Sequence, residues 1–166
     1  EFYHELWRNK HQAMVFRHLI ARSLIDYDSR VLDIGCGDGL LMKKLVDLGC
    51  SVMGVDISQE AVKKCEQKNL QVKKLNFAAE PLPFADNQFD YALLLDVLEH
   101  LYDPLPVISE AGRVARKIII SVPNFNSLPA RLHVLFGRVP ENNLAKKGHV
   151  FWFNFQNLKE IIRCQN

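Results

Sequence analysis

The residues best suited to chemistry in this chain of 166 amino acids are carboxylates and glycines that follow short apolar runs. The first run, at 31–34, contains Asp33 and leads into a loop with three alternating glycines. Apolar residues then recur at helical spacing from Leu40, so the sequence predicts a strand, a tight loop and a helix. Because glycine has no Cβ atom, such a loop lets a ligand approach the backbone closely.

The glycine spacing argues against a dinucleotide cofactor. A dinucleotide-binding loop has the spacing G-x-G-x-x-G, whereas here the third glycine is Gly39 and Leu40 stands where it would be. Asp33 would also repel a diphosphate, but it would attract a ligand with an ammonium or sulfonium group. We therefore expect a cationic ligand. Two alternatives stay open, a glycine-rich turn that binds nothing and NAD-linked oxidoreduction.

A second carboxylate ends the next predicted strand. Residues 51–56 form an apolar run that finishes on Asp56. In a doubly wound sheet, an acid at this place accepts hydrogen bonds from both ribose hydroxyls of a bound nucleoside. Ser58 follows as the expected N-cap of a helix, with Glu60 in its first turn.

A third group of ionisable residues follows a continuous apolar run at 91–95. Such a run is typical of a central parallel strand that is buried on both faces. Asp96, Glu99 and His100 come directly after it, so we expect them at the carboxyl end of that strand. Ligands bind at this edge in open parallel sheets.

The pattern along the whole chain predicts an α/β fold: a Rossmann-like, doubly wound, mostly parallel sheet with helices on both faces. We expect a single domain over 1–166, because no linker or repeat interrupts the alternation of elements. The predicted strands are 31–34, 51–56, 72–77, 91–95 and 117–122. The predicted helices are 5–26, 40–45, one capped by Ser58, 104–114, 125–136 and one capped by Asn154.

The composition is that of an ordinary globular domain, with 48% hydrophobic and 24% charged residues. No apolar stretch is long enough to span a membrane and no leader pattern opens the sequence, so we expect a cytoplasmic protein. The first residue is not Met, so a removed leader stays open. The four cysteines form no C-x-x-C pair and are expected to be reduced thiols.

The charge is nearly balanced. A formal net charge of +2 is too small for an electrostatic grip on nucleic acid, so we do not expect a nucleic-acid partner. Basic residues nevertheless gather at 131–149, where Glu141 is the only acid. This segment has two interpretations, a solvated basic face or a site for anionic substrates.

Asp33, Gly35, Gly37, Gly39 and Asp56 together resemble motifs of the class I methyltransferases that use S-adenosylmethionine (SAM). In that family an acidic residue precedes the spacing G-x-G-x-G. The resemblance covers most of the chain. It implies SAM as the cofactor, S-adenosylhomocysteine as the product, and a small-molecule methyl acceptor with an oxygen, sulfur or nitrogen nucleophile.

The resemblance also implies where the cofactor lies. Residues 78–84 are similar to the family segment D-A-E-x-L-P-F, whose acid binds the adenine amino group, but Ala78 stands in place of that acid. We therefore expect the backbone of Ala79, together with Glu80, to contact the adenine. The full set of expected cofactor contacts is Asp33, Gly35, Cys36, Gly37, Gly39, Asp56, Ile57, Ala79, Glu80 and Asp96.

Methyl transfer from a sulfonium is an in-line displacement, so the protein mainly positions the reactants in a polar cleft with little water. A base that removes the acceptor proton would help, and His100 is the best placed candidate, with His149 second. Asn124, just past the last predicted strand, could orient the acceptor. A structural role is the alternative for each. The resemblance further implies a helical lid at 1–28 and a substrate-side insertion at 125–150.

Two branches of the class share further residues with this chain. Residues 96–100 and the later Gly148-His149 are similar to ubiquinone-biosynthesis O-methyltransferases. Residues 113–125 and 137–140 are more similar to the MetW family of methionine-biosynthesis proteins. The MetW resemblance implies a SAM-binding protein with a regulatory role, or with a homoserine acyltransferase as its partner.

A third branch would add a metal ion. Asp96, Glu99, His100 and His149 are similar to the metal ligands of small-RNA 3′-end 2′-O-methyltransferases, which carry glutamate where Asp96 stands. This likeness implies an RNA substrate. The Glu-His pair is also common in metal-free relatives, where it shapes the start of a helix and the floor of the cleft, so we expect no metal.

Overall fold

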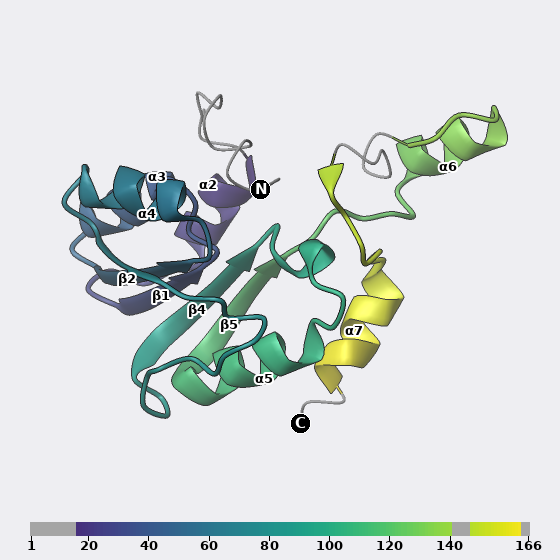
Figure 1. Ribbon diagram of the computed structural model, residues 1–166. Coiled ribbons are helices and arrows are strands. Elements are labelled where there is room, and N and C mark those ends of the chain that lie inside the picture. Colours follow the sequence, from purple (N-terminus) through teal and green to yellow (C-terminus); the bar gives the residue numbers. More distant parts are fainter. Residues whose placement is uncertain (1–15, 141–146, 164–166) are drawn as a thin grey trace.

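The computed structural model describes residues 16–140 and 147–163, and Figure 1 shows their arrangement. The first half contains α2 (Phe16–Ser23), β1 (Arg30–Ile34), α3 (Leu40–Val46), β2 (Ser51–Asp56), α4 (Gln59–Glu66) and β3 (Gln71–Lys74). The second half contains β4 (Phe89–Leu95), the short 3-10 helix η1 (Leu98–His100), α5 (Leu105–Val114), β5 (Ala115–Ser121), α6 (Leu128–Leu135) and α7 (Phe155–Arg163).

The five strands form one sheet in the order β3-β2-β1-β4-β5, and every neighbouring pair is parallel. The chain first builds the sheet outward from β1 to β3 and then returns to add β4 on the other side of β1. The strand order therefore reverses between β1 and β4, where open α/β sheets bind their ligands. This topology confirms the expected doubly wound α/β fold.

Alternate residues of the central strands pack on opposite faces of the sheet, as the pleat requires. Val31 and Leu93 belong to a core shared with α2, α3 and α4, which contribute residues such as Ala21 and Leu45. Leu32 and Leu94 belong to the other core, which α5 completes with residues such as Val107 and Ile108 and against which Leu158 and Ile161 of α7 also pack. Figure 1 shows these two groups of helices on the two faces of the sheet.

Several predicted boundaries were wrong: the helix expected to 26 ends at Ser23, and the strands expected from 91 and 117 begin at Phe89 and Ala115. Two further differences arise where local geometry overrides the apolar pattern. The third strand was expected over 72–77, but β3 ends at Lys74. The chain then turns, since Ala79 N and Glu80 N both donate to Asn76 O at 2.9 Å. The helix expected over 125–136 begins only at Leu128.

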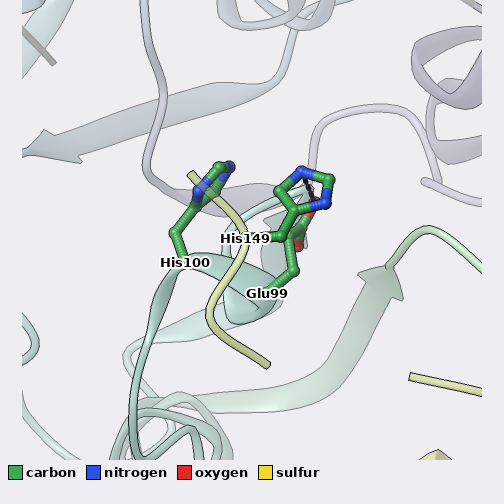
Figure 2. Close-up of side chains that lie close together, drawn as sticks. All are labelled: Glu99, His100 and His149. Carbon is green, nitrogen blue, oxygen red and sulfur yellow. Dashed lines mark ion pairs between the residues drawn. The ribbon is translucent and has the colours of Figure 1, made fainter. Parts of the chain in front are cut away.

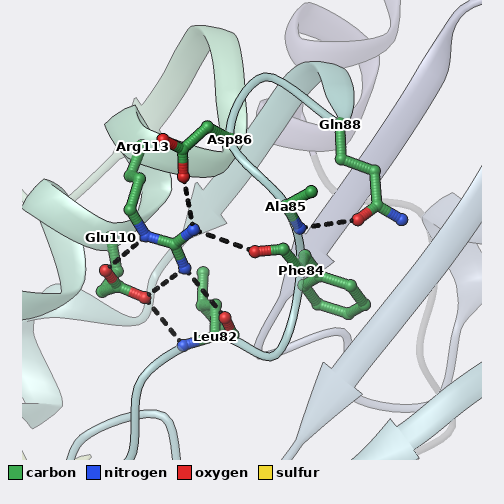
Figure 3. A network of polar contacts seen from close by, with 7 residues as sticks. All are labelled: Leu82, Phe84, Ala85, Asp86, Gln88, Glu110 and Arg113. Carbon is green, nitrogen blue, oxygen red and sulfur yellow. Dashed lines mark hydrogen bonds and ion pairs between the residues drawn. The ribbon is translucent and has the colours of Figure 1, made fainter.

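The proline-rich loop before β4 is fixed by one arginine from α5 (Figure 3). Arg113 pairs with Glu110 through Nε at 2.8 Å and donates to the carbonyls of Leu82 and Phe84, each at 2.9 Å. It also pairs with Asp86 at 2.8 Å. This network has a structural role, because it anchors the loop to α5 without contacting any predicted site residue.

The chain after β5 returns to the sheet through residues 147–154. Asn124 and Phe153 form an isolated parallel bridge, with Phe125 N donating to Phe153 O at 2.8 Å, and Phe153 is buried. Asn154 then caps α7, as expected, because its Oδ1 accepts hydrogen bonds from Gln156 N and Asn157 N.

Two predicted regions fall partly outside the described residues. Of the expected lid at 1–28, only the part from Phe16 onward is described, and of the expected insertion at 125–150, residues 141–146 are not. Within the described ranges, no helix combines the length and the apolar character needed to cross a bilayer.

Candidate functional site

The glycine loop lies between β1 and α3 and is organised by the end of β2. Gly37 N donates to Asp56 Oδ2 at 2.9 Å, and Ser58 N donates to Asp56 Oδ1 at 2.8 Å. Gly35 N and Cys36 N both donate to Val55 O. The second predicted acid is thus joined to the first predicted motif, as two neighbouring parallel strands would place them.

The amide groups of this loop do not form an anion-binding nest. Besides the bonds to β2, Gly39 N donates to Cys36 O at 3.1 Å and Leu40 N contacts Asp38 Oδ1 at 3.3 Å. A loop that holds a diphosphate instead turns its N–H groups toward the ligand. The geometry therefore supports the sequence argument against a dinucleotide.

Two of the glycines are needed for packing as well as for any ligand. Gly35 has φ +75°, and a Cβ there would lie 2.6 Å from Val97 Cγ2 beyond β4. Gly39 has φ +73°, and its Cβ would lie 2.5 Å from Leu70 Cδ1. A larger residue at either position would therefore force a neighbouring side chain to move and would adopt a costly positive φ.

The two predicted aspartates form a buried pair. Asp33 is 5% and Asp56 is 6% exposed. Burial, and then the negative charge of Asp56, raise the pKa of Asp33 to about 7. Burial also raises the pKa of Asp56, although hydrogen bonds from Ser58 and Gly37 oppose that rise. Two acids that repel each other in a dry site would be stabilised by a positive ligand.

Asp96 lies at the carboxyl end of β4 in a strained conformation. Its φ of +55° is uncommon for a residue other than glycine, and such outliers concentrate at functional sites. Ser121 fixes it from β5, through the bond from Asp96 N to Ser121 O and the bond from Ser121 Oγ to Asp96 Oδ1. Arg17 Nη1 contacts Asp96 Oδ2 at 3.0 Å.

Arg17 and its neighbour His18 were not singled out from the sequence, yet they approach the site. Arg17 Nε and His18 Nδ1 are buried without a hydrogen-bond partner among the described residues. Burial and the charge of Arg17 lower the pKa of His18, while Asp96 and Asp38 act in the opposite direction. No local pattern marks these residues, because their position depends on how α2 packs on the sheet.

Glu99, His100 and His149 form a compact cluster on η1 and the returning segment (Figure 2). His149 Nε2 lies 3.9 Å from Glu99 Oε1, and the two imidazole rings are 5.0 Å apart. His100 Nδ1 is 3.0 Å from the carbonyl oxygen of Gly148. Because a carbonyl can only accept, Nδ1 carries the proton in this contact.

Glu99 is the most deeply buried charged residue of this cluster, with 2% of its surface exposed. Neither carboxylate oxygen has a hydrogen-bond partner in the described part of the chain. Burial is the main cause that raises the pKa of Glu99 to about 8. The backbone N–H of Glu99 and the charge of Arg17 oppose that rise. A carboxyl group buried this deeply is costly, so its presence needs an explanation.

The remaining predicted residues lie at the edges of this region. Ala79, Glu80 and Ile57 are exposed, and the N–H of Ala79 already donates to Asn76 O. Asn124 is exposed, and its Oδ1 accepts a hydrogen bond from Asn126 N at 3.0 Å. The turn role that was the alternative for Asn124 is therefore present in the structure.

A hollow with a mixed polar and apolar lining lies elsewhere, between α5, β5 and α7. Its lining residues are Ile108, Ser109, Gly112, Arg113, Ile118, Ile120 and Ile162. This lining contains none of the predicted site residues, most of which gather instead at the carboxyl ends of β1, β2 and β4.

Comparison with known proteins identifies the family and the fold. The model of the family "Methionine biosynthesis protein MetW" matches residues 16–163. A solved SAM-dependent methyltransferase from Archaeoglobus fulgidus superposes with a TM-score of 0.69 and 26% identity, over 99% of this chain and 72% of that one. The fold is thus that of the class I methyltransferases.

Two curated relatives are similar in sequence. A ubiquinone biosynthesis O-methyltransferase from Ruegeria sp. (strain TM1040) is 37% identical over 52% of this chain and 37% of its own length. A bifunctional methionine biosynthesis protein MetXA/MetW from Rhodopirellula baltica is 32% identical over 71% of this chain and 20% of its own length. The chain therefore spans only about a third, or less, of these relatives.

Proposed function

The chain belongs to the MetW family, and from this premise we propose that it is a methyltransferase that moves the methyl group of SAM to a small-molecule acceptor. The observation that carries the proposal is the buried pair of Asp33 and Asp56 beside a glycine loop whose amides are already bonded. Such a site suits a nucleoside with a sulfonium and an ammonium group better than a phosphorylated cofactor.

Each predicted contact has a role in this proposal. Asp33 and Asp96 favour the positive end of SAM. Asp56 keeps lone pairs for the ribose hydroxyls, because a carboxylate accepts more hydrogen bonds than the two it receives from Gly37 and Ser58. The loop residues Gly35, Cys36, Gly37 and Gly39 contribute backbone, and Ile57, Ala79 and Glu80 lie toward the adenine.

SAM supplies a methyl group bound to a sulfonium. When the methyl group is transferred, the sulfur keeps the electrons of the broken carbon–sulfur bond and leaves as a neutral thioether. The protein must then position the acceptor and take its proton. We assign the proton to His100, whose Nδ1–H is directed at Gly148 O so that the lone pair of the neutral ring lies on Nε2. His149 is the second candidate base, and Asn124 orients the acceptor.

A second candidate function is a SAM-binding protein that acts through an acyltransferase partner. The observation that favours it is α6, which has no buried residue and stands away from the sheet in Figure 1. The relative from Rhodopirellula baltica is a bifunctional MetXA/MetW protein, so a related domain occurs fused to a second one. The large apolar residues exposed on and beside α6 are Leu128, Leu132, Val134, Leu135 and Phe136.

The expected cytoplasmic location stays part of the proposal. It is supported by the free thiols of Cys36, Cys50 and Cys65, because reduced cysteines persist in reducing compartments.

The test is turnover of methyl-labelled SAM with a panel of hydroxyl, thiol and amine acceptors, beside a pull-down with a homoserine acyltransferase. We expect label transfer that falls about 100-fold or more in His100→Ala, the range of a lost general base. Capture of the acyltransferase without any transfer would favour the second candidate. Stabilisation by NADH but not by S-adenosylhomocysteine in thermal unfolding would contradict both.

A further inference from the structure

We propose that Glu99, His100 and His149 bind a divalent transition-metal ion. This inference replaces the expectation of no metal, because the structure brings three ligand atoms together from two segments that are far apart in the sequence. It does not depend on methyl transfer, because an ion can bind to the protein alone.

The ligand geometry fits one ion after small side-chain movements. The three ligand atoms lie within 4.8 Å of one another. Nitrogen and oxygen ligands lie about 2.0–2.2 Å from zinc, so they are at most about 4 Å apart around one ion. Rotations that shift the side chains by roughly 1 Å would close the site.

Glu99 is the second and independent observation. Its side chain is buried, and both of its carboxylate oxygens lack a hydrogen-bond partner within the described ranges. It points to the imidazole of His149, as Figure 2 shows. A cation between these groups would contact the carboxylate directly, whereas the nearby groups that can carry a positive charge are the Arg17 guanidinium and the His149 ring, whose Nε2 lies at 3.9 Å.

The backbone holds the ligands in place before any ion binds. Val150 N and Phe151 N donate to Glu99 O at 2.8 and 3.1 Å, which fixes the returning segment to η1. His100 Nδ1 is directed at Gly148 O, and this contact sets the ring orientation and leaves Nε2 as the ligand atom. Metal-binding histidines usually have such a partner on their second nitrogen.

The donor set indicates the class of ion. Two imidazoles and one carboxylate suit zinc, iron(II), cobalt(II) or manganese(II) better than magnesium or calcium, which prefer oxygen ligands. Asp96 is not part of the set, because Ser121 and Arg17 already hold it. Three protein ligands leave coordination positions open for a further oxygen.

A role for the open coordination positions in methyl transfer rests on the proposed function. An acceptor hydroxyl bound there would be held close to Asp96 and the cofactor side of β4. The two histidines would then be ligands rather than bases, and the ion would lower the pKa of the bound hydroxyl so that its proton could leave to water. Loss of methyl transfer alone cannot separate these two roles, so the test measures metal binding without cofactor or acceptor.

The experiment titrates metal-free protein with Zn2+ by calorimetry and with Co2+ by visible absorption, which reports the ligand field. We expect one site per chain. The near-isosteric Glu99→Gln and the truncation His149→Ala should each weaken binding by about 10- to 100-fold or more. His133→Ala is the matched control, because His133 lies on the exposed α6, and it should bind as the parent does.

Circular dichroism of each variant checks that the fold is retained. Binding at one site that only the Glu99 and His149 substitutions weaken supports the proposal. Absence of binding in the parent, equal binding in all variants, or loss in His133→Ala would overturn it.

Discussion

The two groups of polar residues at the carboxyl edge of the sheet are built in opposite ways. At the ends of β1 and β2, the glycine loop and Asp56 satisfy each other through backbone hydrogen bonds, and the elements involved are neighbours along the chain. At the end of β4, Glu99 is buried without hydrogen-bond donors in the described residues, and its neighbour His149 comes from a distant segment. In the first group the loop amides are bonded and only the two acids call for a positive ligand, whereas in the second group the carboxyl oxygens of Glu99 have no hydrogen-bond partner among the described residues.

The largest effect on stability is expected at Gly35. Gly35→Ala should lower the free energy of unfolding by about 2–4 kcal/mol, because the new Cβ meets Val97 and the positive φ is costly for alanine. Gly137→Ala is the control. Gly137 has a similar φ of +66°, but a Cβ added there would meet no neighbouring atom within 4 Å. Chemical denaturation measures both. An equal, small loss in the two variants would show that the loop is not closely packed.

The Asp33–Asp56 pair predicts an unusual pH dependence of stability. The pKa of Asp33 is about 7 in the folded state and near 3.8 when unfolded, so its protonated form favours folding. That contribution is fully present below pH 4 and is lost as the pH rises to 7.

Asp33→Asn should remove this loss and stabilise the protein relative to the parent by about 4 kcal/mol more at pH 8 than at pH 4. Denaturation midpoints across that range provide the measurement. Parallel curves for parent and variant would mean that Asp33 is not protonated in the folded protein.

The loop network predicts a direct effect on cofactor binding. Asp56→Ala should weaken SAM by about 1–3 kcal/mol, because the ribose loses its acceptor and Gly37 loses a partner. Asp47→Ala is the matched control, because Asp47 is an exposed acid that forms an ion pair with Lys43 on α3, away from the glycine loop. Calorimetric affinities that change equally in the two variants would remove Asp56 from the site.

The smallest effect is expected where α2 meets β4. The Arg17–Asp96 pair has side chains that are 39% and 28% exposed, so Arg17→Gln should change the free energy of unfolding by less than about 1 kcal/mol. Thermal unfolding at low and high salt measures it. A much larger loss would show that this pair stabilises the fold rather than only lying beside the site.

The sequence indicated the residues of both groups but not the approach of Arg17 to Asp96, and the reason is physical. Asp33, the glycines and Asp56 lie within two adjacent strand-to-loop units, and the apolar period of each unit locates its carboxyl end. The placement of Arg17 beside Asp96 depends on the packing of α2, which no local pattern encodes. The early end of β3 follows from a turn at Asn76, where apolar residues continue although the strand does not.

The most direct test of the central claim is calorimetric titration of the protein with SAM at pH 6 and at pH 8. If the buried carboxylates hold the positive end of the ligand, SAM should bind more tightly at pH 8 and release a proton at pH 6, as Asp33 ionises. In Asp33→Asn, both effects should disappear. An affinity for SAM that is the same at both pH values, or tighter binding of NADH, would contradict the account.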